Sequence, residues 1–312
     1  MPTELEKLAN YFDDADVVGK MIFGIYALRN ETQLLSIAID NEVKEAFRIA
    51  FLKRAVQLKE YRRIIDYSPN GFGSDEVHKL NIADIPTASN LIQDTTVRVG
   101  TFDKNFIKKI KFIVFRFTKS NGNVVSVFKY YPKTKFLAKH NAFVITGGTL
   151  KISRSNILGL SPSIDCVAIE NKMLIVNRNQ FEKIFDYNAV YLSSATSLFN
   201  KFSANTQFQI TNINDIQTKT TKTLNKLRRL HSILTSNSYA VYDFALIKRI
   251  DSDNNLGIIF EDSHGVKKIK FPDVTTFMEL YEDAYLASLY TQKKYLALSK
   301  RTMQTTPRTR RR

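Results

Sequence analysis

Two stretches of alternating apolar residues near the middle of the chain flank the dipeptide Asn121-Gly122. An Asn-Gly dipeptide in this setting is the strongest short-range signal for a β-hairpin, because both residues accept the positive φ of a tight turn. Residues 111–118 and 124–131 are therefore expected to pair as antiparallel strands. A two-residue turn would set the following residues opposite one another: Phe115 and Phe128, and Ile113 and Tyr130.

The same alternation predicts two further hairpins downstream. One is formed by residues 163–170 and 173–177, and the other by residues 256–262 and 266–271. In the first of these, a turn at residues 171–172 would pair Ile169 with Leu174, Val167 with Val176, and Asp165 with Arg178.

Helical periodicity marks four longer segments. Residues 41–62 form the first, with Asp40 or Asn41 as its N-cap, after two short strands at residues 20–29 and 34–39. The other helices are expected at residues 188–202, 214–234 and 274–300. These elements predict an α+β fold, in which a mixed or antiparallel, hairpin-rich sheet is flanked by helices and two subdomains form.

Turn-forming residues between positions 67 and 90 mark the boundary between the subdomains. We predict an N-terminal α/β subdomain at residues 1–95 and a basic subdomain of hairpins and helices at residues 96–300. Residues 301–312 have no apolar pattern and are expected to form a mobile basic tail.

The charge of the chain is strongly positive and unevenly distributed. Against 30 acidic residues stand 46 Lys and Arg, which gives a net charge of +16. Residues 1–66 are nearly neutral, with 10 basic and 11 acidic side chains, whereas residues 101–140 have 10 basic and one acidic. The last 12 residues add five arginines and no acid. Such an imbalance favours a polyanionic partner, which could be DNA, RNA or anionic lipid.

The sharpest basic pattern lies on the expected helix at residues 214–234. Intervals of three, four and three place four cations on one face within an arc of roughly 80°, namely Lys219, Lys222, Lys226 and Arg229. An apolar stripe beside them would hold the row in place, and we count no acidic residue at i±4 that offsets it. A phosphate backbone would complement this row, and a solvated helix face is the alternative interpretation.

Aromatic and basic residues alternate in residues 101–140, which is typical of surfaces that grip single-stranded nucleic acid by stacking. The expected strand pairing assigns most of these rings to the core and leaves one mixed cluster: Phe112, Arg116, Lys129 and Tyr131. Combining the two basic regions, the candidate DNA-binding residues are Lys219, Lys222, Lys226, Arg229, Lys108, Lys109, Arg116 and Lys129.

Signatures of catalysis are missing from the sequence. It has no Gly-rich phosphate loop, and its one cysteine and four scattered histidines provide no zinc-ligand spacing. Asp165, Glu170 and Lys172 resemble the metal-binding motif of some nucleases, but their spacing is short and the lysine falls in a turn. We therefore predict no catalytic residue, metal ligand or cofactor, and a metal-dependent nuclease stays as an alternative.

The sequence also indicates the compartment. Its acidic start is unlike a secretory signal, and its longest strongly apolar stretch, residues 21–28, is far shorter than the ~20 residues of a membrane-spanning helix. A cytoplasmic protein without direct membrane insertion is expected.

Residues 163–187 read SIDCVAIENKMLIVNRNQFEKIFDY, an expected hairpin that runs into the pattern F-E-K-I-F-x-Y. This block resembles the KwaB family, the B component of the Kiwa anti-phage defence system. The length of the chain, its acidic start and the helix around residues 43–58 are also similar to that family.

The resemblance implies a cytosolic subunit at the inner face of the membrane. Such a subunit associates with the membrane-embedded Kiwa A component and binds phage DNA without strong sequence preference, and the family provides no firm set of catalytic residues. We also expect a homo-oligomer, a dimer. A third interpretation is a non-enzymatic adaptor whose basic surface binds acidic lipid or an acidic protein.

Overall fold

The computed structural model describes residues 2–14, 17–26, 32–37, 39–71, 73–85, 88–92, 98–99, 110–131, 142–146, 149–153, 163–263, 265–287 and 294–296. The chain forms two units, each with its own core. Unit 1 comprises Met1–Tyr67 and Gly73–Tyr187, and unit 2 comprises Ser68–Phe72 and Asn188–Arg312. The units thus divide after residue 187, whereas the sequence predicts a boundary near residue 95. The predicted tail at 301–312 lies outside the described residues.

A nine-stranded mixed sheet forms the body of unit 1, in the order β3-β4-β11-β10-β7-β6-β1-β2-β5. Its strands are β1 (Val17–Tyr26), β2 (Thr32–Ile37), β3 (Arg63–Asp66), β4 (Glu76–Asn81), β5 (Arg98–Val99), β6 (Ile110–Lys119), β7 (Val124–Tyr130), β10 (Cys166–Ile169) and β11 (Lys172–Ile175). The pairs β3-β4 and β2-β5 are parallel, and the other neighbours are antiparallel. A separate hairpin consists of β8 (Ala142–Thr146) and β9 (Thr149–Ser153). The predicted α+β fold with a mixed, hairpin-rich sheet is confirmed.

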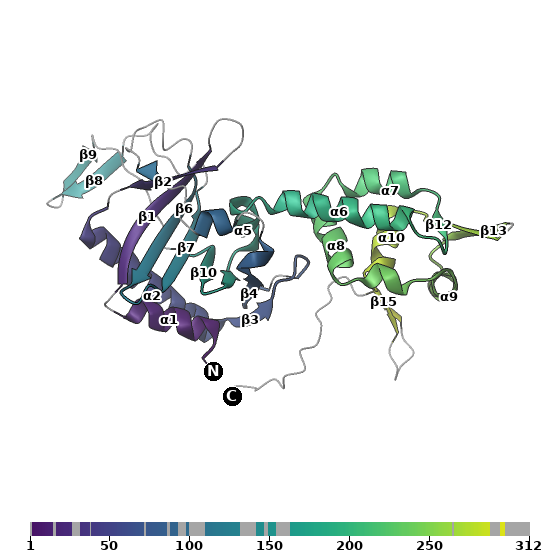
Figure 1. The fold of residues 1–312 in the computed structure, drawn as a ribbon, viewed down its shortest axis with the longest axis horizontal. Helices are drawn as coiled ribbons and strands as arrows, with labels where there is room; N and C mark the ends of the chain where they lie inside the picture. The colour runs from purple at the N-terminus through teal and green to yellow at the C-terminus, as the bar shows by residue number, and fades with distance from the viewer. Residues whose placement is uncertain are drawn as a thin grey trace. The chain divides into compact units, whose positions relative to one another are not determined.

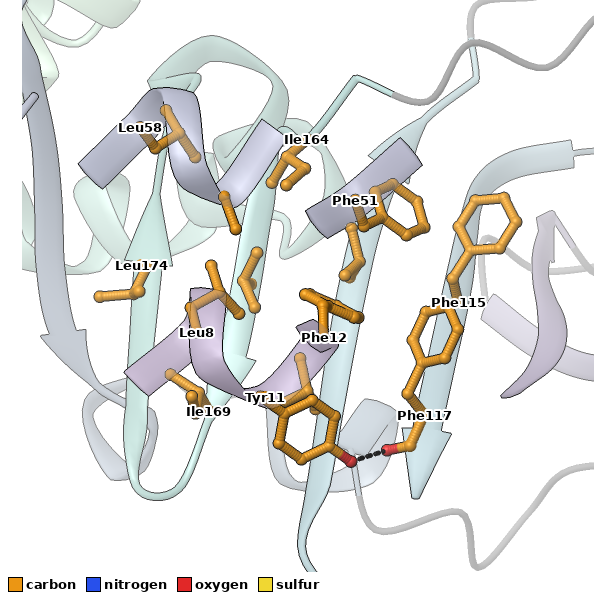
Figure 2. Close-up of a cluster of buried hydrophobic side chains, with 14 of the residues drawn as sticks. Leu8, Tyr11, Phe12, Phe51, Leu58, Phe115, Phe117, Ile164, Ile169 and Leu174 are labelled. Carbon is orange, nitrogen blue, oxygen red and sulfur yellow. Dashed lines mark hydrogen bonds between the residues drawn. The ribbon is translucent and has the colours of Figure 1, made fainter. Parts of the chain in front are cut away.

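Helices α1 (Glu4–Asp13) and α2 (Asn41–Tyr61) cover one face of this sheet (Figure 1). Helix α2 was predicted, whereas α1 was missed although a capping box begins it. In that box Glu6 N–H donates to Thr3 Oγ1 at 3.2 Å, and Thr3 N–H donates to Glu6 Oε2 at 2.8 Å. Both helices bury apolar side chains against the strands in the cluster of Figure 2, which includes Leu8, Phe12, Phe51, Leu58, Phe115, Phe117, Ile169 and Leu174.

The remaining short elements of unit 1 are η2 (Ile82–Asp84), α3 (Ala88–Ile92) and α5 (Arg178–Ile184). Helix α5 packs on the face opposite α1 and α2, where the ring of Phe185, at its C-cap, lies 5.1 Å from that of Phe128 on β7. Phe181, Ile184 and Phe185 are buried there. The family-like pattern F-E-K-I-F therefore provides core residues.

The Asn-Gly hairpin forms as β6 and β7, but its predicted register is wrong by one residue. The turn contains three residues, 120–122, with Gly122 N–H donating to Lys119 O at 2.9 Å and Gly122 at a φ of +82°. Phe115 therefore lies opposite Val127, and Arg116 lies opposite Ser126. Because side chains alternate between faces, this shift of one changes which residues share a face.

We expect Gly122→Ala to destabilise the protein by about 1 kcal/mol, because an L-residue at this positive φ is strained while the hairpin register requires it. A β-carbon at Gly122 would meet no atom within 4 Å, so the cost is conformational rather than steric. Gly71→Ala is the control: it has no positive φ, and its nearest contact would be Ser68 Oγ at an ordinary 3.9 Å. Urea unfolding of both variants measures the difference, and equal midpoints would contradict the expectation.

The second and third predicted hairpins also form. In β10-β11 the turn lies at Glu170-Asn171, and Val167 pairs with Leu174 instead of Val176. This shift of two residues leaves every side chain on its predicted face. The third hairpin consists of β13 (Ile259–Ser263) and β14 (Val266–Lys270), which form a three-stranded sheet with β12 (Gln209–Ile210).

Unit 2 is mainly helical (Figure 1). Its helices are α6 (Tyr187–Ser203), α7 (Ile213–Thr220), α8 (Leu224–Thr235), η4 (Ser238–Val241), α9 (Phe244–Asn254) and α10 (Val274–Tyr281). Aromatic rings from α6 and α10 form the centre of its core, including Phe199, Phe202, Phe277 and Tyr281. No helix among the described residues is both long enough and apolar enough to cross a bilayer.

The predicted helix at residues 274–300 is wrong beyond Tyr281. Asp283 adopts a φ of +55°, so its N–H donates to Leu280 O and the N–H of Ala284 donates to Glu279 O, both at 2.9 Å. These two bonds are those of a Schellman motif, which ends α10. The chain continues as a hairpin of β15 (Tyr285–Ala287) and β16 (Lys294–Leu296).

Candidate functional site

The predicted helix at residues 214–234 is two helices, and the basic row is therefore not one continuous helix face. Helix α7 ends at Thr220 and α8 begins at Leu224, so Lys222 lies in the connection. The hydroxyls of Thr220 and Thr221 donate to the carbonyl oxygen of Gln217, each at 3.0 Å. Such local bonds compete with helix continuation, which explains the break.

The break brings three of the predicted lysines around one pocket. Its volume is about 430 Å³, and it is lined by Lys219, Lys222, Thr223, Lys226, Pro272, Asp273, Val274 and Thr275. The lining residues 219–226 span the end of α7 and the start of α8, and the lining residues 272–275 span the start of α10. The pocket therefore lies where the N-terminal ends of two helices meet.

The three lysines differ in their partners. Lys219 Nζ lies 2.8 Å from Asp215 Oδ2, so an acidic residue at i−4 does offset the first cation of the row, contrary to the prediction. This pair is exposed on both sides, so it contributes only about 0.3–0.5 kcal/mol. Lys226 Nζ donates to the carbonyl oxygen of Lys219 at 3.2 Å, across the helix break. Within the described part of the chain, Lys222 has no hydrogen bond or ion pair.

The N-terminus of helix α8 adds positive electrostatic potential to the pocket. Its N-cap, Thr223, makes no side-chain hydrogen bond to the first turn, whose N–H groups have no partner inside the helix. The helix dipole places about half a positive charge at this end. At α10, by contrast, Asp273 Oδ1 accepts from Thr276 N–H at 2.8 Å, so a carboxylate already caps that helix.

Arg229, the fourth member of the predicted row, does not line the pocket. Its Nε lies 2.9 and 3.0 Å from the two carboxylate oxygens of Glu282, and its Nη2 lies 2.6 Å from Oε2. The hydrogen bonds to Glu282 raise the pKa of Arg229. This forked pair ties α8 to the end of α10, which indicates a structural role.

Arg116 is buried and is removed from the candidate surface. Its Nη2 donates to the carbonyl oxygens of Leu91 and Ile92 at 3.1 and 2.6 Å, and only 4% of the residue is exposed. Lys129, on β7, lies on the face of the sheet opposite Arg116, where its Nζ contacts Ser163 and lies 3.4 Å from Asp165 Oδ1.

The predicted mixed cluster is thus divided between the two sides of the sheet, and its rings, Phe112 and Tyr131, are buried. Lys108 and Lys109 lie outside the described residues. Of the eight predicted DNA-binding residues, the structure brings three together, and all three line the pocket.

The residues of the nuclease interpretation do not converge. Asp165 precedes β10 and accepts from Tyr130 N–H at 2.8 Å, whereas Glu170 follows the same strand and pairs with Lys7 at 2.9 Å. Five residue steps of about 3.3 Å each place the Cα atoms of Asp165 and Glu170 roughly 16 Å apart, too far for both carboxylates to bind one metal ion. Across the described ranges, no group of three His, Cys, Asp or Glu could hold a metal.

Comparison with known proteins adds one family. A family model described as Kiwa protein KwaB-like matches residues 107–291, which include the block at residues 163–187 and the pocket. Neither the curated proteins nor the solved structures contain a match to this chain.

Proposed function

Because this chain belongs to the KwaB-like family, and is thus a component of the Kiwa anti-phage defence system, we propose that it binds phage DNA through the phosphates, with little sequence preference. It does so at the inner face of the membrane, together with the membrane-embedded Kiwa A component. Binding without sequence preference follows from contacts that neutralise phosphates and read no base edge.

The observation that carries this proposal is the pocket with Lys219, Lys222 and Lys226 on its lining. Lysine acts on phosphate as a compact point charge, and a helix N-terminus is a ready anion site. The overall charge of +16 adds long-range attraction for any polyanion. Catalysis is not part of the proposal, since the candidate carboxylates lie at opposite ends of β10.

A salt titration tests the proposal. Affinity for duplex DNA should fall linearly on a log-log plot against salt, with a slope of about −0.9 per neutralised phosphate, and two unrelated sequences should give the same line. Fluorescence anisotropy with labelled duplexes, in Mg²⁺ and in EDTA, provides the measurement. A flat salt response would overturn the phosphate mechanism, and loss of labelled DNA only in Mg²⁺ would favour the nuclease.

Anionic lipid is the competing polyanion, and it is tested in parallel. Vesicles of phosphatidylserine should compete weakly with DNA at equal phosphate concentration. Recovery of the protein in the membrane fraction should require the Kiwa A component. Strong vesicle binding without that component would favour the adaptor interpretation.

A further inference from the structure

The pocket at the start of α8 concentrates positive charge at one point rather than along a groove. Lys222 has no partner among the described residues, and Lys226 is bound only to a neutral carbonyl oxygen. Lys219 is offset by Asp215. Two ammonium charges without a carboxylate partner therefore lie on the lining, beside the uncapped first turn of α8.

We propose that this pocket binds a phosphomonoester, the terminal phosphate of a DNA end or of a free nucleotide, in preference to an internal phosphodiester. The inference rests on the proposed function, because it assigns a ligand to the same lysines. It goes further in predicting that the site distinguishes a chain end from the interior of a chain.

Charge is the first argument for a terminal phosphate. A phosphomonoester carries about −1.5 to −2 charges at neutral pH, whereas an internal phosphodiester carries one. The two lysines without carboxylate partners and the positive end of α8 are offset by the carboxylate of Asp273 on the same lining, which leaves about +1.5 and matches the phosphomonoester better. An internal phosphodiester, with one charge, would leave part of this positive charge without compensation.

Shape is the second argument. The pocket, at about 430 Å³, has the size of small-molecule sites, and residues from the starts of α8 and α10 line it. A terminal phosphate presents three free oxygens and one ester link, so all three oxygens can face the lysines of the lining. An internal phosphate has two free oxygens and a sugar on each side, so it presents fewer oxygens to the lining.

Asp273 gives the proposal a variant that should bind more tightly. Its carboxylate lines the pocket and caps α10 through Thr276 N–H. Asparagine caps helices as well as aspartate does, so Asp273→Asn keeps the cap and removes a negative charge from the lining. Phosphate binding should therefore strengthen in this variant, while a purely structural role of Asp273 would leave it unchanged.

The experiment compares duplexes of one sequence that carry 5′-phosphate or 5′-hydroxyl ends, a closed dumbbell without ends, and deoxyadenosine monophosphate against deoxyadenosine as competitors. We expect the phosphorylated ends to bind about five- to tenfold more tightly than the hydroxyl ends. K222E/K226E should abolish that difference, and D273N should increase it. K248E/R249E, which reverses two exposed cations of α9 in the same unit, should preserve it.

The outcomes separate this inference from the proposed function. Equal binding of all three duplexes, weakened equally by K222E/K226E, would leave DNA binding standing and overturn the preference for ends. Competition by the monophosphate without measurable DNA binding would identify a free nucleotide as the source and overturn DNA binding. If K222E/K226E melts early, K222Q/K226Q repeats the comparison with the fold intact, and an unchanged end preference there would also overturn the inference.

Discussion

Arg116→Ala should destabilise unit 1 by about 3–5 kcal/mol. The substitution removes a guanidinium that donates to the carbonyl oxygens of Leu91 and Ile92 and to Ser126 Oγ. Those buried acceptors would lose a charged donor, and the side chain would leave a cavity in a site that is 4% exposed. Urea denaturation followed by far-UV circular dichroism measures the effect.

Two further variants decide what Arg116 does. Arg116→Lys keeps the charge but loses the forked geometry, so it should recover only part of the stability. Lys183→Ala removes an exposed cation of α5 in the same unit and should change the unfolding midpoint little. If Arg116→Ala were as stable as the native protein and bound DNA more weakly, then Arg116 would be a surface contact as the sequence suggested.

The sequence could not predict the burial of Arg116 because the turn was ambiguous by one residue. Residues 120–123 allow either a two-residue turn at Asn121-Gly122 or the three-residue turn that forms, with Gly122 in the left-handed region. An odd shift exchanges partners between faces, and this moved Arg116 away from Lys129. In β10-β11 the predicted register was wrong by two residues, so each side chain still lies on its predicted face.

The basic helix shows a similar limit. Periodicity across residues 214–234 predicts one helix, yet the hydroxyls of Thr220 and Thr221 make local bonds that favour a break. Asp215 and the capping box at Thr3 were readable in the sequence and were missed. The sequence could not predict that Asp273 lines the pocket, because this residue lies about fifty positions from the lysines and meets them only through tertiary packing.

Arg229→Glu should be the second most damaging change, with a loss of about 2–4 kcal/mol and a fall in melting temperature of several degrees. The new carboxylate would face Glu282, which now accepts three short hydrogen bonds from the guanidinium. Glu279 also contributes to the field that favours a cation here. Differential scanning calorimetry compares the melting temperature of Arg229→Glu with that of K222E/K226E. The lysine variant should melt near the native temperature, because neither lysine forms an ion pair of this kind.

The exchange R229E/E282R then tests whether the pair or the cation matters. It restores opposite charges at the same two positions, so most of the stability should return, although the fork will be less well aligned. DNA affinity should stay near the native value, since Arg229 does not line the pocket and the net charge is unchanged. K222E/K226E should show the opposite behaviour, with normal melting and an affinity lowered more than about tenfold. A swapped protein that melts normally but binds DNA as poorly as the lysine variant would place Arg229 in the binding surface.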